Sequence, residues 1–247
     1  MRLGSVWRAF GDPAFRRDLL WRRLSRPPGV FQISGDTGED RYPEIFRFVR
    51  DTVGGGPGVS LLSFGCSTGE EVFTLRRYFP RAAIDGVDIN PYRIGASRAR
   101  WRREGRDPRL RFIVAGSAIA IPPVRYDAIF CLAVLRHGGL RQGGEAAPRC
   151  DDLIRFEDAA RLVGELARRL KRGGLLAIAH SNFRFTDMPV SNEFAVALTC
   201  DPDTLGPPLY GPDNRLLPGV VYHDLVFRKR AAASEGTTAE TRPHDSR

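Results

Sequence analysis

The 247-residue sequence contains no run of about 18 apolar residues, so it predicts no transmembrane helix. Its first 24 residues alternate arginine with tryptophan, phenylalanine and leucine, and they lack the uninterrupted apolar segment of a secretory signal. We therefore expect a cytoplasmic protein.

Closely spaced ligands for a metal or pairs for disulfides are also missing. The four cysteines lie far apart and form no C-x-x-C pair: Cys66, Cys131, Cys150 and Cys200. The four histidines show no ligand spacing either. This spacing argues against a zinc site and against a disulfide framework, and we expect no metal. Because Cys66, Cys131 and Cys200 lie in or beside apolar segments, we expect them to be buried thiols.

Lysine is nearly absent, since Lys171 and Lys229 are the only two, and arginine supplies almost all of the net charge of +9. A basic chain can bind nucleic acid or an anionic membrane. Here the arginines recur at helical spacing over residues 16–26, 93–111 and 161–172, which favours solvated helix faces. Nucleic acid is therefore not the partner that we expect.

Breaks in composition divide the chain into three regions. A helical N-terminal extension is predicted over residues 1–53, with basic amphipathic segments in 1–26 and a helix over 44–53. A Gly-Gly-Gly-Pro-Gly breaker then opens the main domain, residues 54–230. Residues 231–247 are rich in alanine, serine, threonine and glutamate, and we expect a disordered tail.

The main domain alternates apolar strands with amphipathic helices. Strands are predicted over residues 59–64, 82–88, 110–114, 126–134, 175–179, 194–199 and 222–230. Helices are predicted over 68–79, 91–105 and 151–170, the last ended by Gly173-Gly174, and residues 138–150 are predicted as a structureless loop. This order predicts an α/β, Rossmann-like, seven-stranded, mostly parallel sheet with helices on both faces and the last strand antiparallel at one edge.

A glycine turn follows the first predicted strand, where residues 65–71 read G-C-S-T-G-E-E. Gly65 and Gly69 let the backbone approach a ligand closely, and a serine or threonine hydroxyl between them can cap the next helix. Asp88 closes the second strand, at the distance where a carboxylate accepts hydrogen bonds from the ribose of an adenosine cofactor. A plain strand-to-helix connection remains the alternative.

The two glutamates of the turn discriminate between adenosine cofactors. Glu70 and Glu71 stand where a dinucleotide would place its pyrophosphate, and carboxylates repel phosphates. S-adenosylmethionine instead carries a sulfonium and an ammonium, which a carboxylate attracts. The sequence therefore favours S-adenosylmethionine over NAD, which leaves an NAD-dependent oxidoreductase as a disfavoured alternative.

Five segments in order give the chain a resemblance to the chemotaxis-receptor glutamate O-methyltransferases. The turn over residues 65–71 matches that family's G-C-S-T-G-E-E, and residues 37–46 are similar to its T-x-F-F-R-D-P-E-x-F element. The other three are Asp88-Ile89-Asn90, similar to D-I-D; Y-D-A-I-F-C at 126–131, similar to F-D-x-I-F-C; and L-K-R-G-G at 170–174 leading to H-S at 180–181, similar to L-K-P-G-G and G-H-S-E.

The resemblance implies roles for particular residues. Thr37 would contact the cofactor, Arg41 would lie over the methyl-transfer site, a glutamate of the turn would hold the methionine part, and Asp88 would hold the ribose. The candidate cofactor-binding residues are Thr37, Arg41, Gly65, Cys66, Ser67, Gly69, Glu70, Glu71, Asp88, Ile89, Ala133 and Val134.

Two side chains are candidates for the chemistry. Arg41 can pair bidentately with a carboxylate acceptor, or form an ordinary surface ion pair. His137 follows the fourth predicted strand and can serve as a base, or be a loop histidine without a chemical role. The glycine-rich residues 138–150 are a candidate lid over the pocket or a simple insertion.

Methyl transfer to a carboxylate or another small polar acceptor is the favoured function, the acceptor being a small molecule or a protein carboxylate. The family's Arg-Asn-Val after the fourth strand is replaced by Leu132-Ala133-Val134, so a non-catalytic module that binds S-adenosylmethionine is the alternative. A nucleic-acid methyltransferase is a further alternative that the charge suggests, but the Asn/Asp-Pro-Pro-Tyr motif for base amines is absent.

Overall fold

The computed structural model describes residues 21, 31, 37–142, 144–201 and 206–231. The helices expected within residues 1–26 therefore lie outside the described residues, apart from the helical Trp21. The disordered tail expected over 231–247 lies outside them as well, apart from Ala231.

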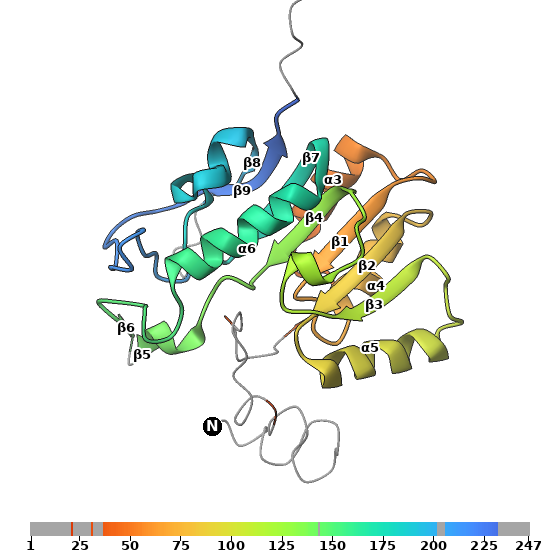
Figure 1. The fold of residues 1–247 in the computed structure, drawn as a ribbon, viewed down its shortest axis with the longest axis horizontal. Coiled ribbons are helices and arrows are strands. Elements are labelled where there is room, and N and C mark those ends of the chain that lie inside the picture. The colour runs from red at the N-terminus through yellow and green to blue at the C-terminus, as the bar shows by residue number, and fades with distance from the viewer. Residues whose placement is uncertain (1–20, 22–30, 32–36, 143, 202–205, 232–247) are drawn as a thin grey trace, which may run out of the picture.

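Seven strands form one sheet in the order β3-β2-β1-β4-β7-β9-β8 (Figure 1). The strands are β1 (Ser60–Phe64), β2 (Ala83–Asp88), β3 (Leu110–Val114), β4 (Tyr126–Leu132), β7 (Leu170–Ala179), β8 (Phe194–Thr199) and β9 (Asp224–Lys229). Neighbouring strands from β3 to β7 are parallel, whereas β9 is antiparallel to both β7 and β8. The predicted Rossmann-like sheet with an antiparallel last strand is confirmed, with β9 one place in from the edge that β8 forms.

Helices cover both faces of this sheet. They are α3 (Pro43–Val53), α4 (Glu70–Tyr78), α5 (Pro91–Arg103) and α6 (Phe156–Arg169), with 3-10 turns η1 (Ala118–Ala120), η2 (Gly138–Leu140), η3 (Phe185–Asp187) and η4 (Pro189–Glu193). Side chains of β4 alternate between two apolar cores: Ile129 packs with α6, and Phe130 packs with α3 and α4. Because both faces are buried, β4 is apolar along nearly its whole length.

Helix α3 fixes the segment that precedes it against the sheet. Its amphipathic pattern buries Ile45, Phe46 and Val49, and the Phe46 ring meets the Phe130 ring edge-on with centroids 5.6 Å apart. Pro43 occupies its first turn, where a missing N–H costs no hydrogen bond. The residues just before α3 are thereby held close to the carboxyl ends of the central strands.

Several predicted boundaries were wrong. Residues 138–150, expected to be structureless, contain η2 and a hairpin of β5 (Arg141–Gln142) and β6 (Glu145–Ala146). Helix α6 begins only at Phe156, because residues 151–155 form a turn and a short extended link. The helix ends at Arg169, before Gly173 and Gly174, which were expected to end it. These two glycines lie within strand β7 instead, where the left-handed Gly173 fits an irregularity in the pairing with β4.

Three smaller expectations also fail. Strand β4 ends at Leu132 and not at residue 134, because Ala133 turns into the left-handed conformation with φ of 56°. Helix α4 is capped by Gly69 and not by a serine or threonine hydroxyl. Cys66 and Cys131 are buried as expected, but Cys200 is only half-buried since it follows the edge strand β8.

Candidate functional site

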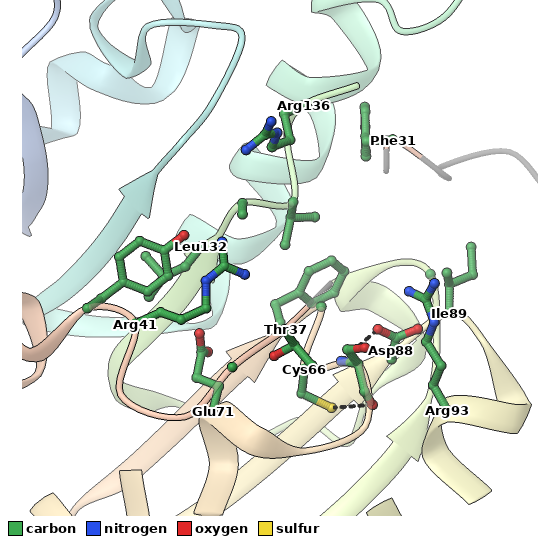
Figure 2. A pocket seen from close by; sticks show the side chains of 18 of the residues that line it. Phe31, Thr37, Arg41, Cys66, Glu71, Asp88, Ile89, Arg93, Leu132 and Arg136 are labelled. Atoms are coloured by element: carbon green, nitrogen blue, oxygen red, sulfur yellow. Dashed lines mark hydrogen bonds between the residues drawn. The ribbon is translucent and has the colours of Figure 1, made fainter. Parts of the chain in front are cut away.

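A cavity of about 410 Å³ lies beyond the carboxyl ends of β1, β2 and β4. The strand order reverses between β1 and β4, and a reversal of this kind leaves a crevice where open α/β sheets bind their ligands. The segment before α3 covers the cavity from the other side. Figure 2 shows side chains from these different parts of the chain around one space.

The turn after β1 depends on a glycine at its start. Gly65 has φ of 81°, and a Cβ at this position would lie 2.4 Å from Cγ2 of Val134. Ser67 is also left-handed, with φ of 51°. Glycine is therefore required at position 65 by the left-handed backbone and by the close approach of the Val134 side chain, and both residues line the cavity.

The second glycine of the turn has a different role. Gly69 has φ of 94°, and a Cβ there would lie 3.1 Å from Phe73 and from Ser97. It does not line the cavity. Gly69 therefore serves the packing of α4 against α5.

Asp88 lies at the end of β2 and faces the cavity with only 5% of its surface exposed. Its Oδ2 accepts a hydrogen bond of 2.9 Å from the N–H of Ser67, and its Oδ1 accepts one of 2.8 Å from the N–H of Asn90. These bonds tie the carboxylate to the turns after β1 and β2. They orient a buried negative charge at the edge of the cavity, as a ribose-binding carboxylate requires.

The two glutamates of the turn point in different directions. Glu71 lines the cavity, and its Oε1 accepts a hydrogen bond of 2.7 Å from the hydroxyl of Ser63. Burial raises the pKa of Glu71 to about 7, against the opposing effects of the Ser63 hydroxyl and the positive charge of Arg41. Glu70 instead accepts a hydrogen bond of 2.7 Å from the hydroxyl of Thr68 and does not line the cavity.

Arg41 and Tyr42 enter the cavity from the segment before α3. The Arg41 guanidinium lies 5.5 Å from the centre of the Tyr42 ring. The Tyr42 hydroxyl is hydrogen-bonded to Nδ1 of His180 at 2.9 Å, and burial raises the pKa of Tyr42. Figure 2 shows Arg41 and Glu71 at one side of the cavity, with Asp88 and Arg93 at the other.

His137 lies outside the cavity lining. Its Nδ1 accepts a hydrogen bond of 3.1 Å from the N–H of Gly139, which caps the turn η2, and its own N–H donates to Oδ1 of Asn182 at 2.8 Å. The visible role of this histidine is to shape the chain after β4.

Ten of the predicted site residues meet around the cavity, and three do not. The lining ones are Thr37, Arg41, Gly65, Cys66, Ser67, Glu71, Asp88, Ile89, Ala133 and Val134, and the others are Gly69, Glu70 and His137. Cys66 is buried, its thiol donates weakly to the carbonyl of Ser67, and burial raises its pKa, so it has no nucleophilic character.

Sequence reasoning missed several lining residues, of which four are polar: Asp40, Tyr42, Arg93 and Arg136. Tyr42 directly follows Arg41, and Arg136 follows Val134 by two residues. The signal available was their position just beyond residues already placed at the carboxyl edge of the sheet.

Within the described part of the chain, no three histidine, cysteine, aspartate or glutamate side chains group together as metal ligands. No helix there has the length and apolar character needed to cross a membrane.

Comparisons with known proteins agree with this architecture. Residues 62–176 match a family model described as a methyltransferase domain. No curated protein matches the sequence. Among solved structures, the StiE O-MT fragment of residues 961–1257 is 16% identical with a TM-score of 0.53, over 94% of this chain and 82% of that one.

A second solved structure is magnesium protoporphyrin IX methyltransferase (ChlM) from Synechocystis PCC 6803, with bound S-adenosylmethionine. It is 16% identical with a TM-score of 0.51, over 92% of this chain and 96% of that one. A longer StiE O-MT fragment, residues 942–1257, is covered over 50% of its length. At these identities the solved structures establish the fold, and the matched family covers the sheet and loops that build most of the cavity. The family match therefore indicates a methyltransferase domain within residues 62–176.

Proposed function

We propose that this domain transfers the methyl group of S-adenosylmethionine to a carboxylate of a small molecule or a protein. The observation that carries the proposal is that Asp88, Glu71 and Arg41 face one cavity, with Asp88 at one side and Arg41 at the other. The arrangement offers one carboxylate for a ribose, one for an ammonium, and a guanidinium for an anionic acceptor. The resemblance to the receptor glutamate methyltransferases favours the same acceptor chemistry.

The residues of the cavity fit S-adenosylmethionine by shape and by charge. The turn at Gly65 lines the cavity, and Asp88 is oriented for the two ribose hydroxyls. Glu71 would pair with the methionine ammonium. When bound, the cofactor supplies an electrophilic methyl group on a sulfonium.

The protein's contribution to the transfer is positioning. An acceptor carboxylate is ionised at neutral pH and needs no general base, which agrees with the placement of His137 outside the cavity. Arg41 would hold one acceptor oxygen by a charge-assisted hydrogen bond and leave the other to attack.

Methylation of a panel of carboxylic acids, alcohols and amines tests the proposal. We expect carboxylates to be methylated, and we expect Arg41→Ala to lower kcat/KM for them about tenfold to a hundredfold, from the loss of a charged hydrogen bond. Arg41→Lys should recover part of the activity, because the positive charge returns without the planar guanidinium that orients the hydrogen bond. Affinity for S-adenosylmethionine should change less than about threefold. Turnover of alcohols or amines alone would refute the carboxylate proposal.

The pH dependence of cofactor binding should report on Glu71. With a pKa of about 7 in the free protein, its carboxylate ionises between pH 6 and pH 7.5 and then attracts the ammonium. Affinity for S-adenosylmethionine should rise roughly eightfold over this interval, as the ionised fraction does. Titration calorimetry should show a flat, weaker profile for Glu71→Gln. A wild-type profile equally flat would remove Glu71 from the ammonium site.

The same group should also affect stability in the absence of ligand. The folded-state pKa lies above the ordinary value of 4.5, so the folded protein holds a proton that the unfolded chain releases. The stability that this group contributes is present below pH 4.5 and is lost as the pH rises to about 7. Urea titrations at pH 5 and pH 8 should therefore show a larger decrease for wild type than for Glu71→Gln.

A non-catalytic module that binds S-adenosylmethionine is the second candidate. It is favoured by the apolar Leu132-Ala133-Val134 segment, which lines the cavity where the resembling family has Arg-Asn-Val. The panel separates the two candidates, because turnover of any acceptor excludes this one.

A further inference from the structure

The part of the cavity beyond Leu132 contains a second arginine that the proposed function does not use. Arg136 lies in the chain after β4, where its backbone N–H donates a hydrogen bond of 2.8 Å to the carbonyl of Val134. This tight turn brings the Arg136 side chain to the cavity lining. Figure 2 shows it on the same side of the space as Arg41 and Leu132, with Asp88 and Arg93 farther away.

The guanidinium of Arg136 has a donor without an acceptor. Among the described residues, its Nε is buried and makes no hydrogen bond. A buried donor that has no partner costs free energy, so native proteins supply an acceptor from the protein, from water or from a ligand. Because Arg136 lines the cavity, a bound molecule can supply it here. The donor therefore points to an anionic or polar group of a bound molecule.

Tyr42 connects Arg136 to the acceptor side of the cavity. Burial raises the pKa of Tyr42, while the positive charges of Arg41 and Arg136 lower it and the negative charge of Glu71 raises it further. All three charged groups therefore lie within electrostatic reach of the one hydroxyl that His180 holds in place. The group around Tyr42 contains two guanidiniums and a single carboxylate, an excess of positive charge.

We propose that the acceptor carries two acidic groups, of which Arg41 binds the carboxylate that is methylated and Arg136 binds the second. The second acid is a carboxylate or a phosphate ester, since either accepts two hydrogen bonds from a guanidinium. The inference rests on the proposed function and adds a specificity-determining residue to it.

The experiment compares acids of matched length. Succinate, glutarate and 3-phosphonopropionate are assayed against butyrate, valerate and the half-amide of succinate, with wild type, Arg136→Gln and Arg136→Ala. Arg172→Gln is the charge control, because Arg172 is exposed, lies on β7 and does not line this cavity. Thermal unfolding of each variant verifies folding.

Wild type should prefer the diacids, and Arg136→Gln should raise their KM at least about tenfold with kcat within about threefold. KM for the monoacids should stay within about twofold, and Arg172→Gln should behave as wild type. Equal effects on diacids and monoacids, or no preference of the wild type, would overturn the inference while carboxylate methylation stands. A tenfold weaker binding of the demethylated cofactor product by Arg136→Gln would also overturn it, because Arg136 would then hold the methionine carboxylate.

The second anion site can also be tested if the protein methylates none of these acids. If no acid is methylated, the proposed function fails, and calorimetric titration of diacids into protein saturated with the demethylated product tests Arg136 by itself. Binding of diacids that Arg136→Gln weakens tenfold supports the second anion site. Absence of such binding overturns it.

Discussion

Asp88→Asn should weaken binding of S-adenosylmethionine at least about a hundredfold. The substitution keeps the side-chain shape but removes the charge that would accept hydrogen bonds from two ribose hydroxyls, each worth about 1.5 kcal/mol or more. Together these correspond to about 3 kcal/mol, or more than two orders of magnitude in the dissociation constant. The NH₂ group of the new side-chain amide would also face the N–H of Ser67 or of Asn90, both of which now donate hydrogen bonds to the Asp88 carboxylate. Titration calorimetry measures the change.

Asp85→Asn is the matched control for this prediction. Asp85 lies on the same strand β2, is equally buried, and accepts hydrogen bonds from Arg111 and the Tyr126 hydroxyl, but it does not line the cavity. Its substitution should lower the unfolding temperature and leave cofactor affinity within about threefold. If Asp88→Asn also bound the cofactor within threefold of wild type, Asp88 would not hold the ribose.

Gly65→Ala should both destabilise the protein and remove most of its cofactor affinity. The left-handed conformation costs a residue with a Cβ about 1–2 kcal/mol. The contact of that Cβ with Val134, at 2.4 Å, adds roughly 1–3 kcal/mol of overpacking. Relief of the contact would push the turn into the cavity, so we expect at least tenfold weaker binding. Urea unfolding and calorimetry report the two effects separately.

Two further variants separate conformation from contact. Gly105→Ala also has a positive φ, 95°, with no atom near its Cβ, so it should lose only the conformational part and bind the cofactor normally. Val134→Ala in the Gly65→Ala background should recover the overpacking part, because it removes the Cγ2 that the new methyl meets. Strictly additive losses in the double variant would show that the contact with Val134 is not the cause.

The elements of the fold were predictable where local signals agree. Glycine at position 65, the carboxylate at 88 and the apolar β4 each follow from a short stretch of sequence, because strand ends and turns are dictated by their own residues. The direction of a side chain is a tertiary property. Glu70 and Glu71 are neighbours in sequence, yet the Thr68 hydroxyl binds one and the Ser63 hydroxyl binds the other, and only the second faces the cavity.

Predictions failed where long-range contacts override local composition. The glycine-rich residues after β4 read as a loop, but Leu140 and Cys150 are buried in the core and hold that region in place. The position of His137 after β4 suggested a catalytic base. In the structure its Nδ1 instead accepts a hydrogen bond from the N–H of Gly139 and so caps the turn η2. The only sequence signal for Arg136 was that it follows β4 closely in the chain, because its burial depends on the packing of residues from other parts of the chain.

The central claim is that the cavity binds S-adenosylmethionine. Isothermal titration of the purified protein with S-adenosylmethionine and with its demethylated product, using NAD as the control, tests it most directly. The account predicts micromolar binding of the first two and no binding of NAD, since Glu71 attracts an ammonium and repels a pyrophosphate. Failure to bind either sulfur compound, or binding of NAD instead, would contradict it.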